Sequence, residues 1–242
     1  MHYEIIDNNK EKWIVLLHCI CSNMHVFDTC IDELSKKHNI LLIDLPGHGQ
    51  SREYKGKIDF KEVSAEIVKI LDNLQIEKFT IWGISLGGVI AKYLLKIVPG
   101  RIEKIIFESP AFMIENKFNL FLFKVFNRIK GILPKGIYLR AFIYAVIPGK
   151  KQKNIRIMMY KHLRLTDYKI ISKWLTELCN EYKNKDFEIL NSSEIEKVYV
   201  LGEYDYIFKK GTTENVKENR FNKIIIKKDC GHLCHLECEI CL

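Results

Sequence analysis

Continuous apolar runs of strand length recur along the chain up to residue 108. They lie at residues 3–6, 12–18, 39–45, 78–82 and 102–108. Between these runs, apolar side chains repeat every three to four positions, which predicts amphipathic helices at residues 26–37, 60–74 and 86–98. Strands that alternate with helices indicate an α/β fold, with a mostly parallel sheet and helices on both of its faces.

Polar and turn-forming residues set the boundaries of several of these elements. Asp7, Asn8 and Asn9 separate the first two apolar runs, so we expect those two strands to form a hairpin. Asp59 precedes the helix at 60–74, where its carboxylate would cap the N–H groups of the first turn. The sequence PGHG stops the strand at 39–45, and His48 within it is expected to be a turn residue.

The pattern changes between residues 112 and 187. No strand period is visible there, and helix-like stretches rich in aromatic and basic residues follow one another. The alternation then resumes with a strand at 198–201, a short helix near 212–218 and a strand at 223–227. We therefore predict an α/β core of residues 1–111 and 188–242, interrupted by a helical insertion of residues 112–187 that forms a lid at one end of the sheet.

The formal net charge of +8 is concentrated in this insertion, which holds 16 Lys and Arg against 5 Asp and Glu. The excess indicates either an anionic substrate, including an acyl group on an acidic carrier protein, or a solvated lysine-rich surface. Nucleic acid is not expected as a partner, because no nucleic-acid-binding motif accompanies the charge.

The N-terminus and the apolar runs bear on cellular location. The N-terminus lacks the basic start and apolar run of a signal peptide, and no run reaches the roughly 18 apolar residues of a membrane span. We therefore expect a cytoplasmic protein without a membrane span, in which the eight cysteines are reduced.

The segment Gly83-Ile84-Ser85-Leu86-Gly87 fits the pattern G-x-S-x-G between a predicted strand and a predicted helix. In so tight a turn, side chains two residues to either side of the serine would collide, so glycine is expected there. The turn holds the serine in a strained conformation with its hydroxyl above the sheet. The helix that begins at this point favours developing negative charge through its N–H groups and its dipole.

A serine hydroxyl is a weak nucleophile and needs a base that an acid orients. In this strand–turn–helix context the acid, and then the base, follow the serine along the chain. Asp205 and His232 have that order, and both follow predicted strands at the sheet edge where Ser85 lies. We predict Ser85 as nucleophile, His232 as base and Asp205 as acid, with Glu108 as the alternative acid.

Acyl transfer to serine also needs two N–H donors for the oxyanion. One is expected to be the backbone N–H of Leu86, directly after the nucleophile, and the other belongs to the loop in LLHCICSN after an early strand. The aromatic residues of the insertion are candidates for an apolar acyl pocket. They are Phe118, Phe121, Phe123 and Phe126.

These stretches together resemble the lidded α/β-hydrolase superfamily, in the branch of small esterases, C–C bond hydrolases, perhydrolases and lyases. The resemblance is carried by LLHCICSNMHVFD, LLIDLPGHGQS, WGISLGGVIA, LGEYDYI and CGHLCHLE, and covers nearly the whole chain outside the insertion. It implies an α/β-hydrolase fold with an eight-stranded, mostly parallel sheet and a helical lid. It also implies the N–H of Ile20 as the second oxyanion donor, with Cys19 where the family usually has glycine.

The resemblance and the triad predict a serine hydrolase of carboxylesterase type, which cleaves a small-molecule carboxylic ester or thioester through an acyl-enzyme. The same three residues can also serve C–C bond hydrolysis or an elimination, and a non-catalytic ligand-binding module is a further alternative. Relatives with an aspartate nucleophile are dehalogenases and epoxide hydrolases, and Ser85 argues against both. No cofactor is expected.

The chain ends in CGHLCHLECEICL, a cysteine-rich stretch around the predicted base. Gly231 is expected to let the backbone turn so that the imidazole of His232 reaches the serine. Cys234, Cys238 and Cys241 are spaced i, i+4, i+7, which predicts one apolar face of a short last helix. A zinc site formed by the cysteines is the alternative that we consider weaker, so we expect no metal.

Overall fold

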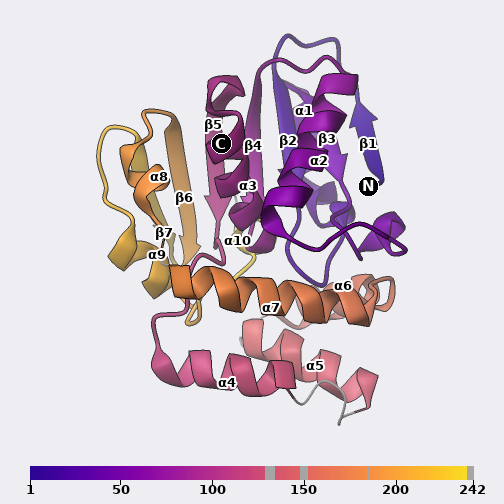
Figure 1. Ribbon diagram of the computed structural model, residues 1–242, viewed down its shortest axis with the longest axis vertical. Helices are drawn as coiled ribbons and strands as arrows, with labels where there is room; N and C mark the ends of the chain where they lie inside the picture. Colours follow the sequence, from indigo (N-terminus) through magenta and orange to yellow (C-terminus); the bar gives the residue numbers. More distant parts are fainter. Residues whose placement is uncertain (129–133, 148–151, 185, 239–242) are drawn as a thin grey trace.

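One sheet of seven strands forms the centre of the computed structural model, which describes residues 1–128, 134–147, 152–184 and 186–238 (Figure 1). The strand order is β1-β3-β2-β4-β5-β6-β7, and every neighbouring pair is parallel except β1 and β3. The strands are β1 (Tyr3–Ile6), β2 (Trp13–Leu17), β3 (Asn39–Ile43), β4 (Phe79–Ile84), β5 (Ile102–Glu108), β6 (Glu196–Gly202) and β7 (Asn222–Lys227). The central strands are almost continuously buried and apolar, as expected for a parallel sheet that is covered on both faces.

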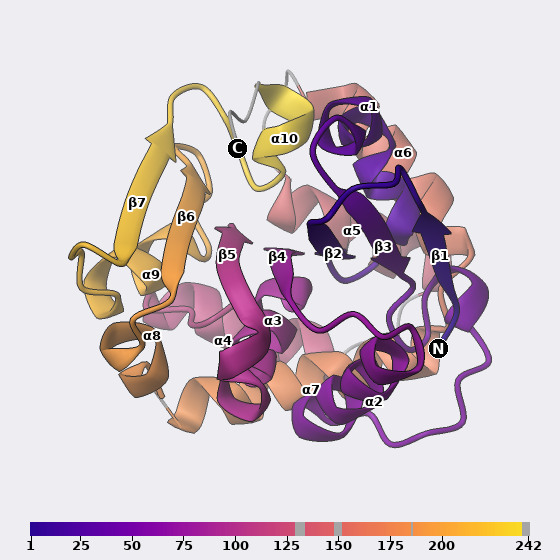
Figure 2. The ribbon, with the colours of Figure 1, turned by 90° about the horizontal axis from the view of Figure 1, so that it is seen from above.

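Helices cover both faces of this sheet, as Figure 2 shows from above: α2, α3 and α8 lie on one face, and α1 and α10 lie on the other. The α-helices of the core are α1 (Ile31–Ser35), α2 (Phe60–Asn73), α3 (Leu86–Ile97), α8 (Glu188–Ser192), α9 (Lys209–Asn215) and α10 (Cys234–Glu237). The predicted cap of α2 is present, since the Asp59 carboxylate accepts from the backbone N–H groups of Lys61 and Glu62. The predicted alternation of strands and helices is therefore confirmed.

Two expectations about the sheet are wrong. The described residues form seven strands, one fewer than the family resemblance implied. The first two strands do not form a hairpin either, because β1 pairs with β3 and β3 separates it from β2. The Asn39 side-chain oxygen, at the start of β3, accepts from the N–H groups of Asn8 and Lys10. These bonds hold the connecting loop across β3, so the chain reaches β2 on its far side.

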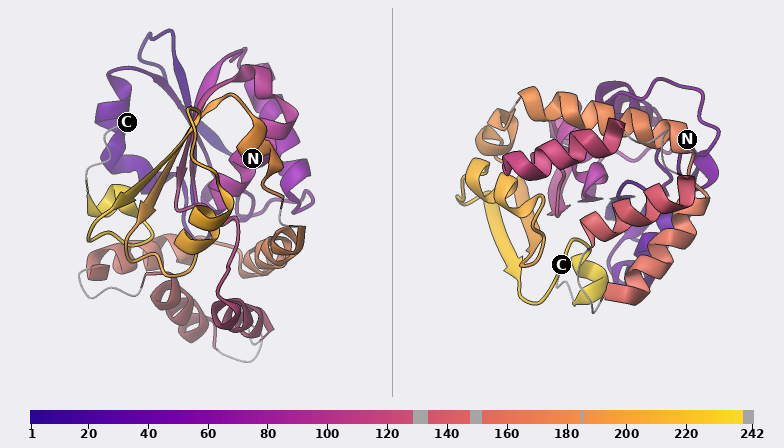
Figure 3. Two further views of the ribbon diagram at one scale, coloured as in Figure 1. Left: turned by 90° about the vertical axis from the view of Figure 1, so that its left-hand side faces the viewer. Right: turned by 90° about the horizontal axis from the view of Figure 1, so that it is seen from below.

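The helical insertion lies across the carboxyl ends of the strands, as Figure 1 and both views of Figure 3 show. It contains α4 (Lys117–Arg128), α5 (Lys135–Val146), α6 (Lys153–Arg164) and α7 (Tyr168–Asn184). α7 lies next to the sheet, whereas α4 and α5 form the layer farthest from it. The boundaries 1–111, 112–187 and 188–242 stay predictions.

Buried polar contacts attach α7 to the core. Lys92 of α3 and Glu181 of α7 form a buried ion pair, and the Tyr93 hydroxyl donates to the same carboxylate at 2.7 Å. The indole N–H of Trp174 donates to the backbone carbonyl of Pro46 at 3.0 Å. Burial lowers the pKa of Lys92, and the charge of Glu181 opposes that shift. The insertion is thus anchored to the helix that follows Ser85.

We expect Glu181→Leu to lower the free energy of unfolding by about 3–5 kcal/mol, because it leaves the Lys92 ammonium buried without its carboxylate. The double variant Lys92→Met/Glu181→Leu should recover most of that loss, since both buried charges are then absent. Urea unfolding followed by circular dichroism measures both values. A double variant as unstable as Glu181→Leu alone would contradict this account of the pair.

Candidate active site

Ser85 lies in a tight turn between β4 and α3, at the carboxyl edge of the sheet. Its backbone has φ 51° and ψ −106°, outside the regions that L-residues favour. A Cβ on Gly83 would lie 2.5 Å from the carbonyl oxygen of Gly87, and one on Gly87 would overlap the carbonyl oxygen of Leu17. Glycine is therefore required at both positions, and the strained turn that the sequence predicts is present.

Asp205 and His232 follow β6 and β7, and the structure brings them together. Oδ2 of Asp205 lies 2.9 Å from Nδ1 of His232, while Oδ1 accepts from the backbone N–H groups of Ile207 and Phe208. Burial raises the pKa of the Asp205 carboxyl, but His232 and these N–H groups outweigh burial and leave the pKa below its usual value. The ionised carboxylate fixes a proton on Nδ1 of His232, which leaves Nε2 able to accept one.

Ser85 and His232 line one small cavity. The other residues that line it are Cys19, Ile20, Cys21, Ile143, Ile147, Met159 and Leu233. The space between atoms is about 310 Å³ and includes open solvent at the mouth. Because the other lining side chains are hydrophobic or cysteine, the cavity suits an apolar group next to a reacting carbonyl.

The insertion contributes to this cavity through different residues from those expected. Ile143 of α5 and Met159 of α6 reach it, whereas Phe118 and Phe121 of α4 are 67% and 60% exposed. Phe123 instead stacks on α7 and does not line the cavity, and the side chain of Phe126 lies outside the described part of the chain. The phenylalanine pocket is therefore a wrong prediction for the three described residues, because α4 lies in the outer layer.

Two buried histidines hold the loop after β2 that carries Ile20. Nε2 of His48 accepts from the Cys21 N–H at 3.0 Å, and Nε2 of His18 accepts from the Leu45 N–H at 2.9 Å. Burial lowers the pKa of both histidines to about 3, so both rings stay neutral and keep accepting. His48, expected only as a turn residue, therefore also supports this loop.

The two residues predicted as oxyanion donors lie on either side of the cavity-facing serine. Ile20 lines the cavity, and Leu86 is the first residue of α3. The N–H of a first helical residue has no acceptor within its own helix, so Leu86 offers a donor next to Ser85. Cys19 is buried beside Ile20, and burial raises the pKa of its thiol to about 12, which keeps the thiol neutral.

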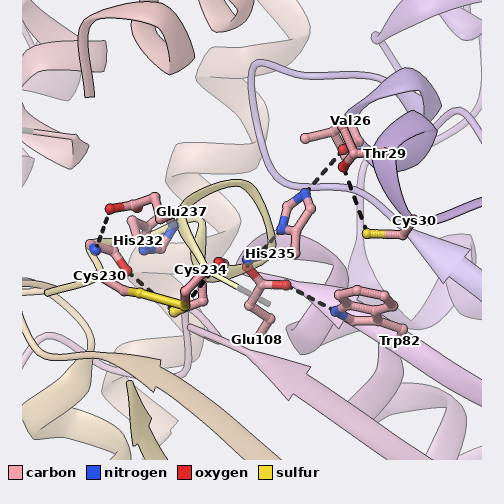
Figure 4. Close-up of polar contacts among 12 residues, drawn as sticks. Val26, Thr29, Cys30, Trp82, Glu108, Cys230, His232, Cys234, His235 and Glu237 are labelled. Carbon is pink, nitrogen blue, oxygen red and sulfur yellow. Dashed lines mark hydrogen bonds and ion pairs between the residues drawn. A yellow bond between two sulfur atoms is a disulfide. The ribbon is translucent and has the colours of Figure 1, made fainter. Parts of the chain in front are cut away.

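A second buried histidine–carboxylate pair lies beside the first (Figure 4). Oε1 of Glu108 lies 2.8 Å from Nδ1 of His235, and Oε2 accepts from the Trp82 indole N–H at 3.0 Å. Nε2 of His235 is 3.0 Å from the Val26 carbonyl, which can only accept. Both ring nitrogens of His235 therefore donate, which requires an imidazolium. Burial lowers the pKa of His235, but the Glu108 carboxylate outweighs burial and leaves the pKa raised.

This pairing bears on the choice of acid. Glu108 was the alternative acid for His232, but the structure pairs its carboxylate with His235, and neither residue lines the cavity. The hydrogen bond to His232 comes from Asp205. The geometry thus agrees with Asp205 as the partner of the predicted base.

Glu237 holds the loop that contains His232. Its Oε2 accepts from the backbone N–H of Gly231 at 2.8 Å and from the side-chain amide of Gln152 at 2.5 Å. Gln152 directly precedes α6, so the same carboxylate joins the insertion to the loop.

The cysteine-rich ending differs from the expected apolar helical face. α10 ends at Glu237, and Cys238 follows it in an extended conformation. Cys238 is joined to Cys230 in a disulfide, so the expectation of eight reduced cysteines is wrong for this pair. Cys234 is buried in α10, and Cys241 lies outside the described residues.

Two searches of the described residues gave negative results. No group of three or more His, Cys, Asp and Glu in that part of the chain is arranged to hold a metal ion. None of its helices is both long enough and apolar enough to cross a membrane.

Three residues of this region were not predicted from the sequence, namely His235, Glu237 and Gln152. Glu108 and His235 are 127 residues apart, and Gln152 and Glu237 are 85 apart, so no local spacing marks either pair. The one usable signal was a carboxylate at the end of a buried strand, which did single out Glu108.

A mostly parallel sheet with a serine in a strained strand-to-helix turn is the arrangement of the α/β-hydrolase fold. The sequence agrees, because residues 12–137 match the family described as alpha/beta hydrolase fold. The match covers more than half of the chain. This protein therefore belongs to the alpha/beta hydrolase fold family.

Sequence similarity to curated proteins covers part of the chain. It is 26% identical over 111 residues to 3-oxoadipate enol-lactonase 2 of Acinetobacter baylyi, which is 46% of this chain and 42% of that protein. It is 30% identical over 115 residues to the pimeloyl-[acyl-carrier protein] methyl ester esterase of Nitrosomonas europaea, 47% of this chain and 43% of that protein. It is 36% identical over 83 residues to the 2-succinyl-6-hydroxy-2,4-cyclohexadiene-1-carboxylate synthase of Pectobacterium atrosepticum, 34% and 32% of the two chains. The chain thus matches less than half the length of these relatives.

Similarity to solved structures extends over nearly the whole chain. MenH from S. aureus superposes with a TM-score of 0.83 at 20% identity, over 98% of this chain and 92% of that chain. The enol-lactonase from Burkholderia xenovorans LB400 superposes with a TM-score of 0.78 at 18% identity, over 98% and 90% of the two chains. Both share the fold with this protein.

The raised pKa of His235 makes the stability that this ion pair contributes depend on pH. A histidine with a raised folded-state pKa stabilises the protein fully below its unfolded-state pKa, here 6.5, and less as pH rises through the folded-state pKa. We expect wild type to exceed Glu108→Gln/His235→Gln in free energy of unfolding most on the acid side of pH 6.5, with a difference that shrinks as pH rises. Urea unfolding at a series of pH values measures it. A difference that grew toward alkaline pH would exclude the imidazolium.

Proposed function

We propose that this protein is a serine hydrolase of carboxylesterase type, which cleaves a carboxylic ester or thioester. In this proposal Ser85 is the nucleophile, His232 the base and Asp205 the acid that orients it. The observation that carries the proposal is one cavity lined by both Ser85 and His232, with His232 hydrogen-bonded at 2.9 Å to a buried, ionised Asp205. The backbone N–H groups of Ile20 and Leu86 form the oxyanion hole.

The reaction proceeds in two acyl transfers. Oγ of Ser85 attacks the carbonyl carbon while Nε2 of His232 takes the hydroxyl proton. Negative charge develops on the former carbonyl oxygen, where the two backbone N–H groups stabilise it. His232 then gives its proton to the departing alcohol or thiol, and the acyl group stays on Ser85. A water molecule that gives its proton to His232 attacks this acyl-enzyme, releases the acid and restores the serine.

The lining of the cavity favours an apolar acyl group. The residues that line its described part include no Lys or Arg, so a substrate carboxylate would find no cation there. Two relatives are named for a methyl ester and an enol-lactone, both of which carry an acyl–oxygen bond. A second candidate is C–C hydrolysis or elimination by the same three residues, which the 36% identity to a carboxylate synthase favours.

We expect Ser85→Ala and Asp205→Asn each to lower kcat/KM for p-nitrophenyl esters by about 10⁴-fold, because one removes the nucleophile and the other the orienting charge. A fluorophosphonate probe should label wild type and leave Ser85→Ala unlabelled. The matched control is Glu108→Gln/His235→Gln, which removes the neighbouring ion pair and should lower kcat/KM much less, at a temperature where circular dichroism shows it folded.

Three outcomes would contradict the proposal. A wild type that neither labels nor hydrolyses any ester is not a serine hydrolase. Labelling of Ser85 without ester turnover would favour the elimination chemistry. A loss in the control variant as large as that in Asp205→Asn would give the acid role to Glu108.

Ile143 and Ile147 should limit the length of the acyl group, since both line the cavity. We expect Ile143→Ala/Ile147→Ala to raise the ratio of kcat/KM for p-nitrophenyl octanoate over p-nitrophenyl acetate by about tenfold, because burial of two more methylene groups contributes roughly 0.8 kcal/mol each. Phe118→Ala/Phe121→Ala should leave the ratio unchanged, because α4 lies outside the cavity. A shift in the second variant and not in the first would place the acyl group against α4.

A further inference from the structure

The segment from residue 116 to residue 166 contains 12 Lys and Arg and no Asp or Glu. It spans α4, α5 and α6, and the acidic residues that flank it are Glu115 and Asp167. A solvated protein surface normally mixes both signs of charge. The positive potential over these helices is therefore not balanced by acidic neighbours in the segment.

The outward stripe of α4 combines basic and large apolar side chains. Lys117, Phe121, Lys124 and Arg128 recur at i, i+4, i+7 and i+11, with Phe118 at the flank of this stripe. Phe118 is 67% exposed and Phe121 60% exposed, although the solvent face of an amphipathic helix is ordinarily polar.

α5 has an outward stripe of the same kind. Ile137 and Tyr144 lie seven residues apart, are 58% and 59% exposed, and have exposed Arg140 beside them. The opposite side of the helix is buried, with Tyr138, Leu139 and Ile143 in the core of the insertion. The apolar residues of α5 thus cover two faces, of which only one is packed inside the protein.

These two stripes lie in the layer of the molecule farthest from the sheet. In Figure 1 and in the left view of Figure 3, α4 and α5 form the extremity beyond α6 and α7. In the view from below, in the right half of Figure 3, both helices lie in front of the rest of the insertion. An exposed apolar patch in this position marks a surface that another phase or partner covers.

We propose that the outer face of α4 and α5 docks on an anionic lipid surface. Basic side chains attract the head groups, while the exposed aromatic and aliphatic side chains enter the boundary between head groups and acyl chains. A nucleic acid would use the charge but has no need of exposed Ile137, which cannot stack on a base. An acidic protein is disfavoured because the charge is mostly lysine, which is depleted at protein interfaces.

The proposal adds a route between the lipid and the cavity. α5 exposes Ile137 and Tyr144 on one side and lines the cavity with Ile143 on the other. A protein seated on its outer face would therefore place the cavity about one helix diameter, roughly 10 Å, from the lipid. Docking itself does not depend on the chemistry of Ser85, so it can be tested in a variant that lacks that hydroxyl.

The experiment is cosedimentation of the full chain carrying Ser85→Ala with phosphatidylcholine vesicles that contain one-third phosphatidylglycerol or none. We expect binding to the anionic vesicles, weakened by salt. Lys117→Gln/Lys124→Gln/Arg128→Gln should weaken it about 100-fold, at roughly fivefold for each charge near the surface. Phe118→Ala/Phe121→Ala should weaken it by at least about tenfold, because interfacial binding scales with the apolar area buried.

The matched control is Lys10→Gln/Lys55→Gln/Lys61→Gln, which removes the same charge from exposed residues of the core and should change binding by less than about threefold. Equal losses in this control and in the α4 charge variant would overturn the proposal, as would no binding to anionic vesicles. Binding that is indifferent to Phe118→Ala/Phe121→Ala and is matched by soluble polyglutamate would assign the surface to an acidic protein. Equal binding to pure phosphatidylcholine would exclude the anionic requirement.

Discussion

Glu108 connects the parts of the structure on which any chemistry at Ser85 depends. Its backbone carbonyl accepts from the Ser85 N–H at 2.9 Å, so the end of β5 holds the strained turn in place. Its carboxylate accepts from the Trp82 indole in β4 and bonds His235, three residues after His232. One residue at the end of a buried strand thus holds the serine turn and the segment that carries the histidine. A residue with φ 51° persists only where the surrounding structure determines its conformation so completely.

Hydrogen-bond partners give the buried histidines different charge states. His18 and His48 each accept a backbone N–H, so they must be neutral, and they brace the loop beside the cavity. His235 faces two acceptors and is an imidazolium, paired with a carboxylate that would otherwise be a buried single charge. His232 has a carboxylate at Nδ1 and the cavity on its other side, which is the environment of a base. Four buried imidazoles therefore differ in role because of what their second nitrogen meets.

The helical insertion meets three environments at once. α7 packs on the core through a buried ion pair with α3, the helix that starts at the serine turn. α5 and α6 supply apolar side chains to the cavity, and Gln152 before α6 joins the insertion to the loop of His232 through Glu237. α4 and the outer stripe of α5 face away from all of these contacts. Cavity shape and outer surface are thus set by opposite sides of the same helices, so a change in their packing alters both.

The sequence by itself determined what depends on neighbouring residues. The collision that requires glycine at Gly83 occurs within one turn, and strand order along the chain placed Asp205 and His232 at the same sheet edge as Ser85. The cap at Asp59 and the alternation of strands and helices are equally local. Only the tertiary structure decided the pairings between distant residues: β1 with β3, Glu108 with His235, Cys230 with Cys238, and α5 in place of α4 at the cavity. Periodicity shows that a helix has an apolar face, but burial depends on how helices stack, and no short stretch of sequence contains that information.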